Sequence, residues 1–283
     1  MTKIQNGLFV VATPIGNLGD MSARALEVLT TVNKIACEDT RVTGRLLSRF
    51  SINTPMMAYH DHNAVKVRPG LLADLRKGAA IALVSDAGMP TISDPGYKLI
   101  QACIKDNIPL TVLPGANAAL IGLVQSGLPT DRFFFQGYLP PKSGARMLEL
   151  EELSDIPATL IFYESGKRLS KSLADMASVL GNRPAAVARE LTKLHEEVCR
   201  GYLAELAAAY GVAGAPKGEI VVVVAPPEVL PPDESELGVM LAEKLNHLSV
   251  KDAASEVAQI TKTPRKTLYS MAVRLRRELD GEK

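Results

Sequence analysis

The chain has 283 residues, of which 32 are lysine or arginine and 31 are aspartate or glutamate, so its formal net charge at pH 7 is +1. This length is enough for two ordinary domains, and the 47% share of apolar residues is that of a globular protein with a sizeable core. No apolar run approaches the roughly 18 residues of a membrane helix, and the N-terminus lacks the apolar segment of a signal peptide. We therefore expect a cytoplasmic protein without a membrane partner.

The first half of the chain alternates strand and helix patterns. Short apolar, β-branched runs predict strands over residues 8–12, 34–38, 56–60, 80–84 and 110–113. Helical spacing predicts a helix after an N-cap at Ser22 and further helices over residues 65–77 and 97–105. Strands that alternate with helices form a mainly parallel sheet covered on both faces, so the sequence predicts an α/β fold.

The second half of the chain repeats this style. Strands are predicted over residues 133–137, 159–163, 185–188 and 220–224. Helices are predicted between them, around residues 167–180 and 203–210.

Stretches rich in proline and glycine divide the chain. Residues 127–144 are rich in both and indicate one boundary, and the proline pairs at 226–227 and 231–232 indicate a second linker. The sequence thus predicts an N-terminal α/β domain over residues 1–127, a second α/β domain over residues 128–227, and a helical tail over residues 233–283.

Three predicted strands of the first half end in loops where backbone can approach a ligand closely. These loops lie at residues 13–16, 85–88 and 113–117, and each contains glycine. Ligands of open parallel sheets bind beyond the carboxyl ends of strands. Each loop alone is more often a simple turn, but three in one domain favour a binding site. No phosphate-binding glycine motif follows a strand, which disfavours a dinucleotide or ATP site.

Ordered motifs along the chain resemble a known family. They are Val11-Ala12-Thr13-Pro14-Ile15-Gly16-Asn17-Leu18, Glu38-Asp39-Thr40-Arg41, His60-Asp61-His62-Asn63, Val84-Ser85-Asp86-Ala87-Gly88-Met89-Pro90, Asp94-Pro95-Gly96, Leu113-Pro114-Gly115, Phe162-Tyr163-Glu164-Ser165, Ala188-Arg189-Glu190-Leu191-Thr192-Lys193 and Lys217-Gly218-Glu219. Together they resemble the ribosomal small subunit methyltransferase I family, within the tetrapyrrole methylase (class III methyltransferase) superfamily. One departure is Met89, where the family pattern has threonine.

This resemblance implies a fold and a cofactor. It implies two α/β domains with S-adenosylmethionine (SAM) in the cleft between them, and a homodimer. Methyl transfer from SAM is a displacement that needs no metal, so none is expected. Carried over to matching positions, the residues that bind SAM are Pro14, Ile15, Gly16, Asp86, Ala87, Gly88, Met89, Ala116, Asn117, Ala118, Tyr163, Lys217, Gly218 and Glu219.

The resemblance also implies an activity. It is SAM-dependent 2′-O-methylation of a cytidine ribose in the decoding region of 16S ribosomal RNA, with the assembled small subunit as the expected partner. Two alternatives stay open: methylation of a tetrapyrrole or another small molecule, and a non-catalytic nucleic-acid-binding regulator. The regulator leaves the loops at the strand ends unexplained.

Methyl transfer to a hydroxyl needs donor and acceptor to be aligned and is helped by a proton acceptor. Glu190 and Glu164 lie at predicted strand ends and are candidates for this catalytic role, as is Glu38. The alternative is that each carboxylate only hydrogen-bonds a nearby loop. Lys193 is a candidate base if its pKa is lowered; otherwise it contacts phosphate or is a solvated surface lysine.

Several basic residues are candidates for RNA contact. Arg41 and Arg189, near strand ends, either bind phosphate or pair with a neighbouring carboxylate. His60 and His62 lie two residues apart like a metal pair, yet no third ligand is evident, which favours a structural or RNA-contacting role for His60. Cys37, Cys103 and Cys199 are far apart, so free thiols are expected rather than zinc ligands or disulfides.

The predicted tail resembles a helix-turn-helix. One helix ends near Ile260, the Thr261-Lys262-Thr263-Pro264 segment breaks it, and a second helix runs over residues 265–279. Its candidates for RNA contact are Arg265, Lys266 and Arg274. The alternative is a small docking or dimerisation element whose charges are only solvated.

Overall fold

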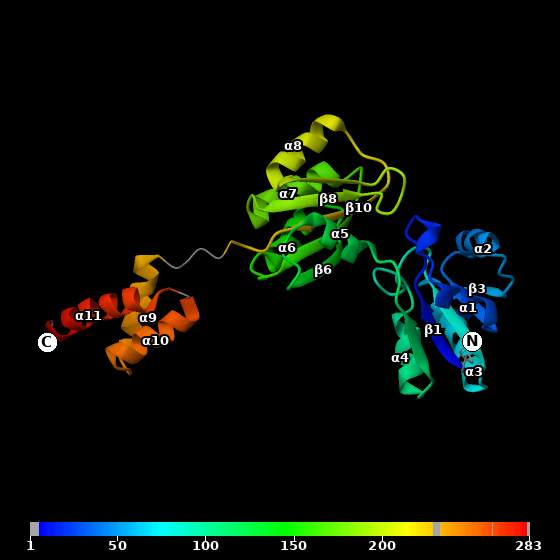
Figure 1. The fold of residues 1–283 in the computed structure, drawn as a ribbon, viewed down its shortest axis with the longest axis horizontal. Helices are drawn as coiled ribbons and strands as arrows, with labels where there is room; N and C mark the ends of the chain where they lie inside the picture. The colour runs from blue at the N-terminus through cyan, green and yellow to red at the C-terminus, as the bar shows by residue number, and fades with distance from the viewer. Residues whose placement is uncertain (1–5, 229–232, 262, 282–283) are drawn as a thin grey trace. The chain divides into compact units, whose positions relative to one another are not determined.

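The computed structural model describes residues 6–228, 233–261 and 263–281. Contacts divide the chain into two compact units, one that ends at Pro227 and one that begins at Glu228 (Figure 1). In the described part of the chain, the first unit contains two five-stranded sheets and the second is helical. The division into three domains stays a prediction.

The first sheet consists of parallel strands in the order β3-β2-β4-β1-β5. Its strands are β1 (Gly7–Val11), β2 (Lys34–Cys37), β3 (Met56–Ala58), β4 (Ala80–Val84) and β5 (Leu110–Leu113). The predicted parallel α/β sheet is thereby confirmed, although β3 ends before His60. Because β4, β1 and β5 are neighbours, the three loops that follow them meet at one edge of the sheet.

Helices cover both faces of this sheet, as expected. They are α1 (Ala23–Thr31), α2 (Thr40–Arg49), α3 (Ala64–Arg76) and α4 (Tyr97–Lys105). Phe9 and Val11 of β1 pack in one apolar cluster with residues of α1 and α2, whereas Leu8 and Val10 pack in another with residues of α3 and α4. This alternation follows from the period of two residues in a strand. Ser22 caps α1 as predicted, because its side chain accepts a hydrogen bond from the Ala25 amide.

The second sheet has the order β6-β7-β10-β8-β9 and is mixed. Its strands are β6 (Phe133–Tyr138), β7 (Thr159–Ser165), β8 (Pro184–Arg189), β9 (Glu197–Tyr202) and β10 (Glu219–Val224). Only the β6–β7 pair is parallel, and the other three pairs are antiparallel. The second half therefore does not repeat the parallel pairing of the first. For β8 and β9 the reason is the short loop 190–196 that joins them, which permits only antiparallel pairing.

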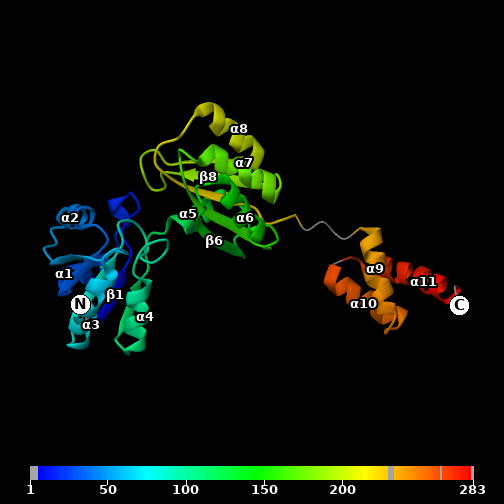
Figure 2. The ribbon, with the colours of Figure 1, turned by 180° about the vertical axis from the view of Figure 1, so that it is seen from behind.

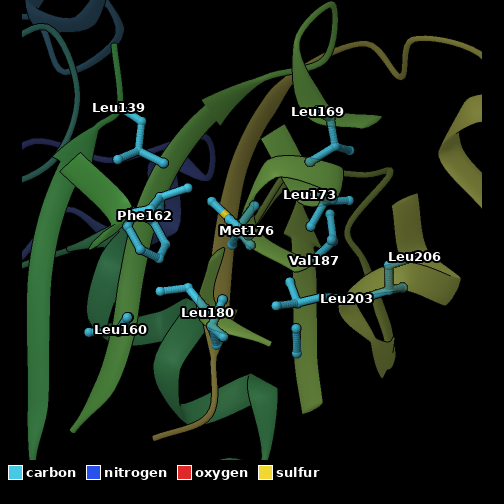
Figure 3. Packing of buried hydrophobic residues seen from close by; sticks show 14 of the residues in the cluster. Leu139, Leu160, Phe162, Leu169, Leu173, Met176, Leu180, Val187, Leu203 and Leu206 are labelled. Atoms are coloured by element: carbon cyan, nitrogen blue, oxygen red, sulfur yellow. The ribbon is translucent and has the colours of Figure 1, made fainter. Parts of the chain in front are cut away.

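One face of the second sheet is covered by α6 (Ser143–Leu153), α7 (Leu169–Leu180) and α8 (Leu203–Ala213). The helices α7 and α8 lie side by side in both views (Figures 1 and 2). Figure 3 shows Met176 of α7 between Phe162 of β7 and Val187 of β8. Each such fully buried side chain stabilises the fold by about 1.5–3 kcal/mol.

The opposite face is covered by α5 (Ala118–Ser126). A Cβ atom at Gly122 would lie only 2.8 Å from Cγ1 of Val221 in β10, so glycine allows this close approach. Ile15 and Leu191 belong to the same apolar cluster. The loop after β1 is thus packed against the second sheet.

The second unit has its own apolar core. Its helices are α9 (Glu234–Leu245), α10 (Val250–Thr261) and α11 (Arg265–Gly281), and all three contribute to the core. The predicted break between the last two helices is present, although Lys262 lies outside the described residues. The short 3₁₀ helix at Leu18–Asp20 completes the elements of the described chain.

Candidate functional site

A cavity of about 280 Å³ lies at the carboxyl-terminal edge of the first sheet. Ile15 follows β1, Glu38 follows β2 and residues 86–89 follow β4. Asn117 and Ala118 reach the cavity from the start of α5, and β7 and β10 of the second sheet contribute further lining residues. The cavity therefore lies where the sequence predicted a ligand.

The predicted ligand-binding residues fall into two groups. Those that line the cavity are Ile15, Asp86, Ala87, Gly88, Met89, Asn117, Ala118, Tyr163 and Glu219. Those that are not among the lining residues are Pro14, Gly16, Ala116, Lys217 and Gly218, and each lies within two residues of one in the chain. Further lining residues that the sequence motifs did not indicate are Tyr138, Leu191, Ile220, Val221 and the segment 92–94.

Hydrogen bonds hold the loops after β1 and β4 together. The Thr13 amide donates to the Gly88 carbonyl over 2.9 Å, and the Gly88 amide donates back to Thr13 over 3.0 Å. The buried Ser85 hydroxyl donates to the same Gly88 carbonyl over 3.1 Å. Gly88 has φ +77°, a conformation that glycine adopts without strain. These hydrogen bonds hold the two loops that place Ile15 and Asp86 in the wall of the cavity.

Carboxylates crowd one side of the cavity. Asp86 accepts a hydrogen bond from the Asp39 amide over 3.1 Å, and burial raises the pKa of Asp86. Burial, followed by the charge of Glu38, raises the pKa of Asp94 to about 6. The pKa of Glu38 is raised by burial and by the charge of Asp86. Carboxylates that repel one another give the cavity a negative potential, and this potential attracts a cation.

Asp94 reaches the cavity from a strained segment. Thr91 and Ser93 have φ of 72° and 65°, which residues with side chains rarely adopt. A Cβ atom at Gly137, where β6 contains a bulge, would lie 3.1 Å from the Ser93 hydroxyl. Loop 91–96 is therefore held against the second sheet, and this contact sets the position of Asp94.

Two tyrosines form the wall on the side of the second sheet. The rings of Tyr138 and Tyr163 meet edge to face with their centroids 5.6 Å apart. Phe135 contacts Tyr163 in the same manner at 5.0 Å. Burial raises the pKa of Tyr163 to about 12, so its hydroxyl stays protonated. Asn117 caps α5 through its side-chain oxygen.

An ion-pair cluster joins the loop after β1 to the second sheet. The Lys193 ammonium lies 2.8 Å from Glu190 and 3.0 Å from Glu219. Lys193 packs so closely on Gly16 that a Cβ there would lie 2.3 Å from its Cγ atom. A Cβ at Gly218, with φ +100°, would likewise collide with the Glu190 carboxylate. Both glycines are therefore needed for the cluster.

This cluster corrects one prediction. Burial opposes the charge of Lys193, but its hydrogen bonds to Glu190 and Glu219 outweigh burial and raise its pKa above the ordinary value. Lys193 thus stays protonated at neutral pH and does not act as a base. The hydrogen bond from Lys193 lowers the pKa of Glu190, which stays ionised.

Glu164 is buried within β7 and is not among the residues that line the cavity. Its carboxylate accepts hydrogen bonds from the Ser165 amide at 2.6 Å, the Ser172 hydroxyl at 2.5 Å and Arg168 at 3.0 Å. These donors occupy the carboxylate, in line with the structural alternative for this residue.

The predicted RNA-contacting residues of the first unit have partners within the chain. Arg41 pairs with Asp39 at 2.6 Å, and Arg189 pairs with Glu197 at 2.8 Å. His60 contacts His62, with ring centroids 6.0 Å apart. Among the described residues, no group of three or more His, Cys, Asp or Glu is placed to hold a metal ion.

In the second unit, Arg265 and Lys266 are exposed, and Arg274 pairs with Glu234 at 2.8 Å. RNA contact by these residues stays a prediction. No helix in the described ranges is long and apolar enough to cross a membrane.

Two family models match the chain. The model described as tetrapyrrole (corrin/porphyrin) methylases matches residues 7–207, and one described as the RsmI C-terminal HTH domain matches residues 231–276. Together they cover the first sheet, four of the five strands of the second sheet and most of the helical unit, but not β10.

Relatives match over nearly the full length. A protein of Mesorhizobium japonicum named ribosomal RNA small subunit methyltransferase I is 45% identical over 280 residues, 99% of this chain and 95% of the relative. A protein of Erythrobacter litoralis with the same name is 50% identical over 271 residues, 95% of each chain.

Solved structures share the fold. A cobalt precorrin-4 methyltransferase has a TM-score of 0.57 at 13% identity and covers 77% of this chain and 94% of its own. A uroporphyrin-III C-methyltransferase of Thermus thermophilus in complex with S-adenosylhomocysteine has a TM-score of 0.53 at 18% identity, with coverage of 77% and 96%. At these identities the likeness concerns the fold alone.

Proposed function

Because the chain belongs to the ribosomal RNA small subunit methyltransferase I family of tetrapyrrole methylases, we propose the reaction that it catalyses. In this proposal it methylates the ribose 2′-hydroxyl of a cytidine in the decoding region of 16S ribosomal RNA. It is a SAM-dependent methyltransferase. The family resemblance supplies the cytidine and its location.

The lining of the cavity carries the proposal for the methyl donor. Its charged residues are all carboxylates, namely Glu38, Asp86, Asp94 and Glu219, and no described lysine, arginine or histidine lines it. Such a cavity suits a cation and repels phosphate groups or the carboxylates of a porphyrin. Its volume of about 280 Å³ is just below the roughly 300–1,000 Å³ of small-molecule sites. The residues present therefore fit SAM.

When bound, SAM supplies a methyl group on a positively charged sulfur. In this proposal, Asp86 and Glu38 favour that positive charge, and the apolar side chains of Ile15 and Val221 exclude water. Lys193 keeps Glu219 in place through its ion pair. The protein contributes mainly alignment, because the transfer is an in-line displacement.

The proton of the acceptor hydroxyl needs a destination. Asp94 lines the cavity, and its pKa of about 6 leaves it mostly ionised yet able to accept a proton near neutral pH. We assign the proton acceptor to Asp94. Glu164 and Lys193 do not take this role, because the first is occupied by hydrogen bonds and the second is protonated.

The remaining expectations concern partners. We propose that the protein acts as a homodimer in the cytoplasm on the assembled small ribosomal subunit. The helical unit, with exposed Arg265 and Lys266, would contribute phosphate contacts that orient the RNA without specifying its sequence.

Labelled SAM tests the proposal directly. Small subunits from a strain without this gene, 16S RNA free of proteins and a tetrapyrrole precursor are offered as acceptors. We expect label in the subunits, and about tenfold or greater loss of SAM affinity in Asp86→Ala by calorimetry. The matched control is Asp131→Ala, an exposed carboxylate outside the cavity. Label in the tetrapyrrole alone would favour the small-molecule alternative.

A further inference from the structure

The helix α2 carries three arginines on one face. Arg41, Arg45 and Arg49 follow one another at intervals of four residues, which places them along the same side of the helix. At a rise of 1.5 Å per residue, the series extends over about 12 Å. All three side chains are exposed.

These arginines line a groove between α2 and the segment that leads to β3. Thr40, Ser48 and Asn53 add polar groups to the groove, and none of its described lining residues is acidic. Leu47 anchors α2 in the apolar core below. The groove is therefore cationic and has a rigid base.

Arg45 and Arg49 have no hydrogen-bond or ion-pair partner among the described residues. Arg41 differs, because Asp39 engages its Nε and Nη2 atoms. The hydrogen bonds from Arg41 lower the pKa of Asp39 to about 2, so this pair persists at neutral pH. One arginine is held in place, and two keep all their donors for an external partner.

The series begins at the rim of the cavity. Glu38, which lines the cavity, is followed by Asp39, the N-cap of α2, whose amide donates to Asp86. Arg41 lies in the first turn of α2, and Arg45 and Arg49 lie farther along the helix. An acidic cavity thus lies directly beside a basic groove.

We propose that this arginine face of α2 binds the phosphate backbone of the ribosomal RNA strand whose target ribose enters the cavity, an inference that rests on the proposed function. The acidic cavity repels phosphates, so the strand must be held outside it while one ribose enters. Arginine suits this task, since its planar fork donates two hydrogen bonds to one phosphate.

The double variant Arg45→Ala/Arg49→Ala tests the inference in the full chain. The matched control is Lys98→Ala/Lys105→Ala on α4, which removes two exposed positive charges from the opposite face of the same sheet. Methyl transfer to small subunits is measured over a range of salt concentrations. RNA binding is measured separately by fluorescence anisotropy with an oligoribonucleotide of the decoding region.

We expect the KM for subunits to rise roughly tenfold for each arginine removed, with kcat and SAM affinity unchanged. The slope of log affinity against log salt should fall by about 0.7–0.9 for each lost phosphate contact. The α4 control should match the parent protein in both measurements.

Two outcomes separate this inference from the proposed function. If the double variant has the KM, RNA affinity and salt slope of the parent, the arginine face of α2 does not bind the RNA, whereas methylation by the parent protein would still support the proposed function. If the double variant loses RNA binding but the parent transfers no methyl group, RNA binding by the arginine face of α2 is supported and the proposed activity is refuted.

Discussion

Replacement of Asp94 by asparagine separates the role of this carboxyl group in catalysis from its effect on folding. Burial and the charge of Glu38 raise its pKa to about 6 from the ordinary 3.8. At about 1.36 kcal/mol per pKa unit, this difference corresponds to about 3 kcal/mol. Because Asp94 keeps part of its contact with solvent, we discount the effect to about 1–2 kcal/mol.

The direction of the effect on stability follows from proton binding. A carboxyl group whose pKa is higher in the folded than in the unfolded state binds its proton more tightly when folded. The parent protein therefore loses stability as pH rises from 3.8 through about 6. Asp94→Asn should be about 1–2 kcal/mol more stable than the parent at pH 8, and this gain should vanish near pH 4. Urea unfolding without ligand measures both values.

The effect on activity has the opposite sign. Removal of a proton acceptor should lower kcat by about 10²–10⁴ at pH 8, with a much smaller change in SAM affinity. In the parent, kcat/KM should fall as pH drops through about 6, because protonated Asp94 accepts no proton. This inflection should be absent in the variant.

The exposed Asp131 offers a matched control, since Asp131→Asn removes a carboxylate outside the cavity. Full activity of Asp94→Asn with an unchanged acidic limb of the pH profile would refute the assignment of the proton acceptor. Unchanged stability at pH 8 would refute the account of its burial.

Three further predictions concern packing and the separate units. Gly16→Ala should displace Lys193 and weaken SAM binding about tenfold in calorimetry, and a second substitution, Lys193→Ala, should restore part of the affinity. If the effects of the two substitutions on the binding free energy simply add, the contact between Gly16 and Lys193 does not matter for SAM binding. Glu164→Ala should lower the free energy of unfolding by about 3–5 kcal/mol because Arg168 loses its buried partner, and unfolding curves that match the parent would refute this. Truncation after Pro227 should keep SAM affinity by calorimetry but raise the KM for subunits, and equal activity of the truncated chain would remove the helical unit from RNA recognition.

Local sequence patterns were sufficient for most strands and for the parallel direction of the first sheet, but not for the strand directions of the second sheet. The apolar runs of β1, β4 and β10 are buried throughout or nearly so, and such runs identify strands directly. The strand β9 was missed because its partly exposed residues lack an apolar run. The antiparallel β8–β9 pair was missed with it, and the antiparallel direction of β10 depends on tertiary packing that no local pattern indicates.

The residues of the candidate site could also be predicted only in part from the sequence. Asp86 and Gly88 were predictable because their loop follows a buried strand and is rich in small residues. Asp94 and Tyr138 were not, because tertiary contact between the strained loop at Ser93 and the bulge of β6 brings them to the cavity. The protonation of Lys193 depends on Glu190, three residues before it, and on Glu219, which is distant in the sequence, so a local pattern could indicate only the first of these contacts.

The identity of the methylated nucleoside is the most direct test of the proposed 2′-O-methylation of a cytidine in 16S ribosomal RNA. Small subunits from a strain without this gene are incubated with the protein and labelled SAM, and the RNA is digested to nucleosides for mass spectrometry. We expect label in 2′-O-methylcytidine with the parent protein and a loss of this label with Asp94→Asn. Label on a base, or no label in RNA while SAM binding is intact, would contradict it.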